Sequence, residues 1–125
     1  FAKSKNVIWI TVISSAEGKQ GYIQPNDAVN TFASFGSFPD HILVDENGDL
    51  GKKFNAKTTP HIFIADKNKN IVYQGAIDDA GGSKFWTMDL NQSTNFVKKV
   101  INDIKSNKPL SVSKTRPYGC SVKYG

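Results

Sequence analysis

The only cysteine in the 125-residue chain is Cys120, which lies close to the C-terminal end. A thiolate is the nucleophile in disulfide exchange, and positive charge close to a cysteine favours that form. Lys114, Arg116 and Lys123 lie near Cys120 in the sequence. A cysteine on an exposed chain end can therefore attack another sulfur and close a disulfide. An incidental surface thiol and a cross-link between two chains are the alternative interpretations.

The second candidate for chemistry is the Thr59-Pro60 step, which comes just before the apolar run from Ile62 to Ala65. A bond preceding proline adopts the cis form at a cost of only about 0.5–1 kcal/mol. A cis-proline before a strand would leave the backbone groups of Thr59 facing outward, where they could pair with an extended substrate or border a sulfur. An ordinary trans-proline at the start of a strand is the alternative.

Other polar clusters favour structural roles. The stretch Asp45–Asp49 resembles a calcium loop, but Leu50 and Ala56 stand where glycine and glutamate are needed, so it predicts a turn. His41 and His61 have no second pair of ligands in the sequence pattern, so no metal site is expected. Asp78 and Asp79 are interpreted as capping a loop.

Composition excludes several classes of function. One cysteine excludes an internal disulfide framework and a cysteine-based zinc site. The net charge is +5, but the lysines are scattered and there is a single arginine, which favours a solvated basic surface over a nucleic-acid site. The longest apolar stretch is too short to span a membrane. No nucleic-acid partner and no membrane partner are therefore expected.

The hydrophobic pattern predicts elements that would position these residues. The β-branched run from Val7 to Ile13 suits a strand covered on both faces. A helix is expected from about Pro25, because proline is typical of a first helical residue and apolar residues then recur at helical spacing. A short strand at His41–Val44, the turn at Asp45–Gly48 and one or two helical turns within Leu50–Asn55 follow.

The second half predicts a hairpin and a helix. Strands at Ile62–Ala65 and Ile71–Tyr73 are joined by a short polar connection, which favours antiparallel pairing. A loop over Asp79–Gln92 precedes a final helix, for which Ser93 or Thr94 is the expected cap. The apolar face of that helix is expected to hold Phe96, Val97, Val100, Ile101 and Ile104. Residues 111–125, called the tail below, read as an extended basic segment. The fold class is therefore α/β with a mixed sheet.

Three stretches together resemble one family: "VIWITVISSAEGKQGY", "GKKFNAKTTPHIFIADKNKNIVYQGAIDD" and "KTRPYGCSVKY". In this order and spacing they are similar to the redoxin branch of the thioredoxin-like superfamily, of the alkyl hydroperoxide reductase / thiol-specific antioxidant (peroxiredoxin-like) type. The resemblance implies a thioredoxin-like fold, in which a mixed β-sheet is flanked by helices. It implies that Pro60 is a cis-proline facing an active thiol, that Thr59 borders that thiol, and that Cys120 is a candidate resolving thiol.

The same resemblance implies that the sequence is incomplete at its N-terminus. The family's reactive cysteine lies on a strand and turn that would come before Phe1, and Phe1–Lys5 would be the end of the helix that follows. Residues 1–110 would be a thioredoxin-like domain lacking its first strand and most of its first helix, and 111–125 the extended tail. Because that strand is central in the family, its removal would leave a gap of about 10 Å in the sheet.

The function implied is thiol-based redox chemistry, either peroxide reduction or thiol–disulfide exchange, by the full-length protein. Its substrate would be a peroxide or a disulfide, its reductant a thioredoxin-like protein or a small thiol, and no cofactor is implied. The chain as given lacks the primary nucleophile and is expected to be inactive alone. A non-catalytic thioredoxin-like binding or structural module is the alternative. An extracytoplasmic location is an expectation from the resemblance alone.

Overall fold

The computed structural model describes residues 3–34, 38–79 and 94–124, and these divide between two compact units. The first unit comprises 1–56 and 121–125, and the second comprises 57–120. Each contains helices and strands, so the protein is of the α/β class. No helix in the described part of the chain is long and apolar enough to cross a membrane.

The first unit is built on two parallel strands, β1 (Ile10–Ile13) and β2 (His41–Val44), which pair from Ile10 opposite His41 to Ile13 opposite Val44. The strand expected from Val7 starts only at Ile10. The backbone N–H of Trp9 is taken by the Asp40 carboxylate at 2.7 Å, so the strand ladder begins after it.

The expectation that this strand is covered on both faces is wrong for the described residues. Ile13 is buried, but Ile10 is 49% and Val12 38% exposed, and Leu43 of β2 is 46% exposed. A parallel pair normally has both faces covered, so this apolar strand is only partly enclosed.

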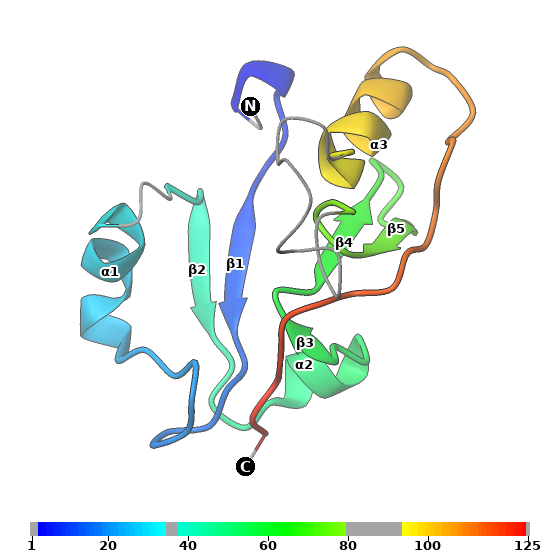
Figure 1. Ribbon diagram of the computed structural model, residues 1–125. Coiled ribbons are helices and arrows are strands. Elements are labelled where there is room, and N and C mark those ends of the chain that lie inside the picture. Colours follow the sequence, from blue (N-terminus) through cyan, green and yellow to red (C-terminus); the bar gives the residue numbers. More distant parts are fainter. Residues whose placement is uncertain (1–2, 35–37, 80–93, 125) are drawn as a thin grey trace. The chain divides into compact units, whose positions relative to one another are not determined.

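Short helical elements flank the pair. A 3₁₀ turn at Lys3–Lys5 stands where the end of a helix was expected. Pro25 opens a second 3₁₀ turn (Pro25–Asp27), which leads directly into α1 (Ala28–Ser34). In Figure 1, α1 lies beside β2, and its buried residue is Ala28.

The turn after β2 has the form that its sequence predicts. Gly48 N–H donates to Asp45 O at 2.9 Å, and Gly48 has a φ of 72°, a conformation that glycine adopts at little cost. The short helix α2 (Asp49–Lys53) follows directly, within the region where one or two helical turns were expected.

The end of the tail belongs to the first unit. Ala16 N–H donates to Lys123 O at 2.7 Å, and the Tyr124 hydroxyl donates to Ala56 O at 2.8 Å. The Lys52 ammonium lies 5.4 Å from the centroid of the Tyr124 ring. These contacts fix the last described residues against the turn and α2.

The second unit contains the expected hairpin. Its strands β4 (Ile62–Ala65) and β5 (Ile71–Gly75) are antiparallel, with an irregularity in register between Ile64 and Ala65. Asp66 Oδ1 accepts hydrogen bonds from Asn68 N–H at 2.9 Å and Asn70 N–H at 3.1 Å, which fixes the polar connection.

The helix α3 (Phe96–Lys105) supplies half of the described buried hydrophobic residues of this unit. Val100 and Ile101 are buried, and Tyr73 of β5 is fully buried with its ring centroid 6.5 Å from that of Phe96. The buried hydrophobic residues of the second unit are Tyr73, Ala76, Val100 and Ile101.

The predicted helix cap is wrong. Asn95 is the N-cap, because its side chain accepts from Lys98 N–H at 2.9 Å, while Thr94 N–H donates to Asp79 Oδ1 at 2.7 Å. The other predicted cap, Ser93, and most of the predicted loop over Asp79–Gln92 lie outside the described residues.

The described strands do not form the single mixed sheet that was expected. They form three two-stranded sheets: β1 with β2, β4 with β5, and a third pair between β3 (Thr58–Thr59) and β6 (Cys120–Ser121). Parallel and antiparallel pairs are both present, but each described strand is paired with a single other strand.

Candidate functional site

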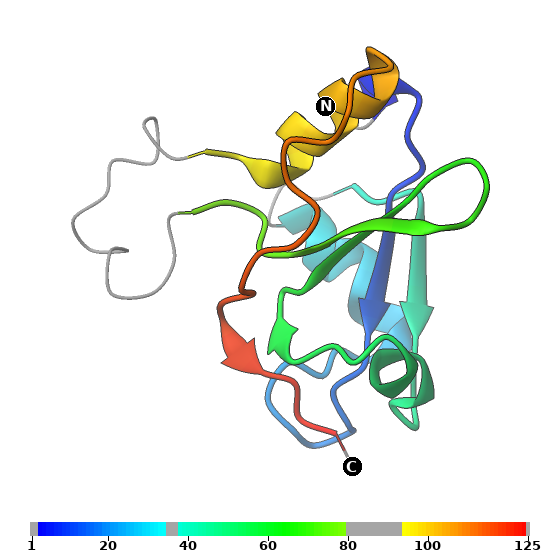
Figure 2. The same cartoon turned by 90° about the vertical axis from the view of Figure 1, so that its right-hand side faces the viewer.

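The three residues singled out in the sequence come together around the third strand pair. β3 ends at Thr59 directly before Pro60, and it pairs with β6, which begins at Cys120. Figure 2 shows the red arrow of β6 beside the green arrow of β3. The Thr59-Pro60 peptide bond is cis, as the family resemblance implies.

Glycine at position 119 permits the close approach. Gly119 has a φ of 130°, and a Cβ on it would collide with the carbonyl oxygen of Thr59 and come within 3.4 Å of Pro60 Cδ. Only a residue without a side chain fits this backbone against β3. The glycine before Cys120 is therefore a determinant of the site that the sequence pattern did not single out.

The site is open to solvent. Thr59, Pro60 and Cys120 are all exposed, and Thr58 is half-buried with its hydroxyl donating to Pro60 O at 2.8 Å. A thiol held at the surface can be reached by a second sulfur.

His61 borders the site and has a structural role. Its Nδ1 accepts from Lys57 N–H at 3.1 Å, and its ring stacks on Phe63 with centroids 4.5 Å apart. Partial burial, together with the positive charge of Lys57, lowers the pKa of His61 below 6.5. The neutral ring that results can accept the backbone hydrogen bond.

The tail reaches the site along β5. Gln74 N–H donates to Ser113 O at 3.1 Å, and Thr115 N–H donates to Gln74 O at 3.0 Å. The Thr115 Oγ1 accepts from Ala76 N–H at 2.9 Å and shares a hydrogen bond of 2.6 Å with the Tyr73 hydroxyl. The tail is thus tied to the core before it reaches Cys120.

A hydrogen bond between a tyrosine and a carboxylate attaches the tail to the second unit between Thr115 and Cys120. The Tyr118 hydroxyl donates to Asp78 Oδ1, and both side chains are half-buried. Burial, followed by the hydrogen bond to Asp78 and the charges of Asp78 and Asp79, raises the pKa of Tyr118 to about 12. Asp79 joins the two ends of the following loop through Thr94, and Asp78 forms an antiparallel bridge with Asn95 at the same place, in addition to its contact with Tyr118.

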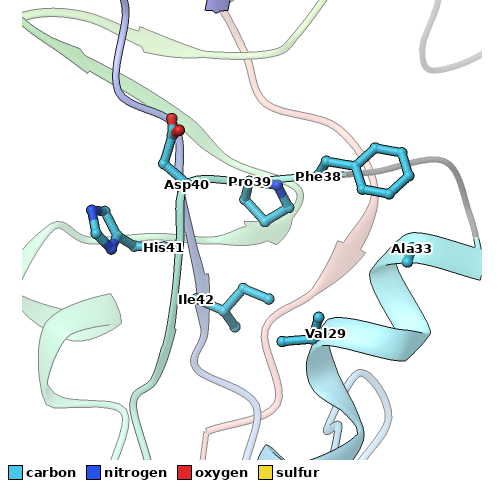
Figure 3. A pocket seen from close by; sticks show the side chains of 7 residues that line it. All are labelled: Val29, Ala33, Phe38, Pro39, Asp40, His41 and Ile42. Atoms are coloured by element: carbon cyan, nitrogen blue, oxygen red, sulfur yellow. The ribbon is translucent and has the colours of Figure 1, made fainter.

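The first unit has a separate hollow of ≈ 430 Å³ between α1 and the start of β2. Val29, Ala33, Phe38, Pro39 and Ile42 give it apolar walls. Figure 3 shows the side chains of Asp40 and His41 directed away from α1, and Asp40 Oδ2 accepts from Trp9 N–H. The described lining of this hollow is therefore mainly apolar.

Within the residues that the structure describes, no group of three or more His, Cys, Asp or Glu side chains could hold a metal ion. His41 and His61 belong to different units. The chemistry available at the described site is that of the exposed Cys120 thiol beside β3.

Comparison with known proteins gives the fold alone. No family model matches the chain, and no curated protein matches it. Solved structures do match the chain, and they include the crystal structures of a hypothetical protein from Sinorhizobium meliloti (TM-score 0.81, 19% identity) and of an uncharacterized conserved protein from Geobacillus kaustophilus (TM-score 0.81, 21% identity). Each covers 99% of this chain.

The chain spans less than two thirds of these structures, at 65% of the first and 63% of the second. At such identities the likeness concerns the fold, which is an α/β fold shared with both proteins.

Proposed function

We propose that the chain is part of a thiol-based redox protein with a thioredoxin-like fold, related to the redoxins of the peroxiredoxin-like type. One observation carries the proposal: the cis-proline turn at Thr59-Pro60 and the strand that begins at Cys120, far apart in sequence, are paired side by side. In this proposal Cys120 is the resolving thiol, and the primary nucleophile is a cysteine N-terminal to Phe1.

The proposed reaction has three steps. The thiolate of the primary cysteine attacks the peroxide O–O bond, becoming a sulfenic acid while an alcohol or water leaves. The Cys120 sulfur then attacks the sulfenic sulfur, forming a disulfide and releasing water with the thiol proton. A thioredoxin-like protein or a small thiol reduces this disulfide and is itself oxidised. The exposed position of Cys120 gives both the sulfenic acid and the reductant access to it.

Peroxide consumption in the presence of dithiothreitol tests this assignment. We compare the 125-residue chain with a form extended at its N-terminus by the natural upstream sequence, each with and without Cys120→Ser. The extended form is expected to turn over and the 125-residue chain to be nearly inactive. In the extended form, Cys120→Ser is expected to stop disulfide formation and leave the sulfenic acid open to trapping by dimedone.

Two outcomes would contradict the proposal. Robust turnover by the 125-residue chain that survives Cys120→Ser would show that the activity does not depend on a cysteine, because Cys120 is the only cysteine in this chain. An extended form without peroxide or disulfide chemistry would favour a non-catalytic binding module built on the same fold.

Gly119→Ala tests the contact between the tail and β3. The methyl group would collide with Thr59 O, so the stretch carrying Cys120 must shift away from Pro60. Disulfide formation in the extended form should slow, and the free energy of unfolding should fall by about 1–3 kcal/mol. Gly18→Ala is the matched control, because Gly18 also has a positive φ (+77°) but a Cβ there meets nothing within 4 Å. If both variants form the disulfide at the same rate, the contact does not matter for the chemistry.

A further inference from the structure

Two residues before Cys120, a side chain of the tail is hydrogen-bonded to the body of the second unit. There the Tyr118 hydroxyl donates to Asp78 Oδ1. The preceding anchor is Thr115, which β5 holds through the hydrogen bonds to Gln74, Ala76 and Tyr73. Tyr118 is therefore a second anchor of the tail, between Thr115 and the thiol.

The acceptor, Asp78, has a fixed position. It forms a β-bridge with Asn95, the N-cap of α3, and its neighbour Asp79 bonds with Thr94 in both directions, at 3.1 Å and 2.7 Å. Phe96 N–H also donates to Ile77 O at 2.9 Å. The carboxylate that receives Tyr118 is thus attached to the start of α3 and, through it, to the core.

The hydroxyl is suited to act as a permanent donor. Tyr118 is half-buried, and its pKa of about 12 keeps its proton in place over the physiological range. Hydrogen bonds to a charged acceptor are stronger than those between neutral groups. The hydrogen bond between Tyr118 and Asp78 therefore stabilises the observed position of the tail.

We propose that Tyr118 and Asp78 are positioning residues that keep Cys120 beside the Thr59–Pro60 turn. Breaking the pair removes the side-chain hydrogen bond that holds the tail between Thr115 and β6, so the contact of Gly119 with Thr59 O is populated less often. The consequence for catalysis rests on the proposed function, since a resolving thiol reacts faster when its sulfur is held near the site of attack. The positioning itself does not depend on that function.

The position of Cys120 can be measured directly. A nitroxide spin label is attached to Cys120, the only cysteine in the chain, and any cysteines outside this sequence are replaced by serine. Paramagnetic broadening of the Thr58 and Thr59 amide signals then reports how often Cys120 lies next to β3. Amide signals of Val100 and Ile101, which are buried in α3, show in the same spectrum whether each variant is folded.

Tyr118→Phe and Asp78→Ala should each shift the ratio of docked to undocked tail by about fivefold, with a matching loss of broadening at Thr59. Combining the two should add little, because they remove the same hydrogen bond. Asp78→Asn keeps an oxygen acceptor and should retain much of the broadening. If Tyr118→Phe does not fold, the comparison of Asp78→Ala with Asp78→Asn still tests the inference, because only Asp78→Ala is expected to lose most of the broadening at Thr59.

Tyr124→Phe is the matched control. It removes one hydroxyl from the same tail, but that hydroxyl bonds to Ala56 O in the first unit. It should leave the broadening at Thr59 unchanged. Equal losses in Tyr124→Phe and Tyr118→Phe, or no loss in Tyr118→Phe, would overturn the inference. Neither result would affect the peroxide assay, and an inactive enzyme would not affect this measurement, so the two proposals fail separately.

Discussion

Asp45 shows how one side chain organises a turn. Its Oδ2 accepts from the Ser14 hydroxyl at 2.7 Å and from Gly51 N–H at 2.8 Å, and its Oδ1 accepts from Leu50 N–H at 3.1 Å. Partial burial opposes ionisation, but these hydrogen bonds outweigh it and lower the pKa of Asp45 below 3.8. The carboxylate thus joins β1, the turn after β2 and the start of α2.

The lowered pKa of Asp45 predicts a pH dependence. Its contribution to stability is fully present above the unfolded-state pKa of about 3.9 and is lost as the pH falls through the lower folded-state pKa. Asp45→Asn should cost about 1 kcal/mol at pH 7, and the difference from the parent should shrink below about pH 4. Urea unfolding at both pH values measures this. Glu46→Gln, at an exposed position of the same turn, controls for the lost charge, and an equal deficit for Asp45→Asn at both pH values would contradict the expectation.

At the scale of elements, the tail acts as an additional partner of β5. Lys114 forms a parallel bridge with Gln74, and the next residue, Thr115, places its hydroxyl between Tyr73 and Ala76. Tyr73 and Ala76 are both buried, so these hydrogen bonds satisfy polar groups that water does not reach. A segment that reads as an extended tail therefore completes the polar interior of the second unit.

Thr115→Val removes this hydroxyl while keeping the shape of the side chain. Ala76 N–H loses its acceptor in a buried position, so the free energy of unfolding should fall by about 1–3 kcal/mol. Chemical denaturation followed by circular dichroism provides the measurement. The same exchange at Thr11, a partly exposed position in β1, should change stability far less. Equal losses of stability in Thr115→Val and Thr11→Val would show that the hydrogen bonds of the Thr115 hydroxyl do not stabilise the second unit.

At the scale of the whole molecule, the described core is small. Each unit relies on two-stranded sheets, which are marginal by themselves. The described residues bury six hydrophobic side chains, whereas Ile8, Trp9, Phe38 and other large apolar residues are exposed. Exposed apolar surface of this kind contributes no burial free energy to the fold.

We therefore expect the isolated 125-residue chain to have low stability and to unfold over a broad range of temperature. Thermal unfolding monitored by circular dichroism, on a sample shown to be monomeric by sedimentation, measures this. The form extended at its N-terminus is the comparison, and it should unfold at a higher temperature and over a narrower range. A sharp two-state transition of the monomeric short chain would contradict the expectation.

The sequence by itself determined the local elements. Alternating and β-branched runs predicted β2, the β4–β5 hairpin and the polar turns, because side-chain period and turn residues act over a few neighbours. The predicted apolar face of α3 contains both residues that the helix buries, Val100 and Ile101. The observed N-cap of α3 is Asn95, one residue after the predicted Thr94, whose backbone N–H is hydrogen-bonded to Asp79.

Only the tertiary structure decided how distant segments meet. The pairing of β3 with β6 depends on contacts between residues far apart in the sequence, which leave no periodic signal. The same holds for the contact of Gly119 with Thr59 and for the hydrogen bond of Tyr118 to Asp78. The sequence around Gly119 and Tyr118 does not indicate these partners, which only the three-dimensional structure shows. The sequence thus determined which residues could do chemistry, and the three-dimensional contacts of the tail decided that Cys120 lies beside Pro60.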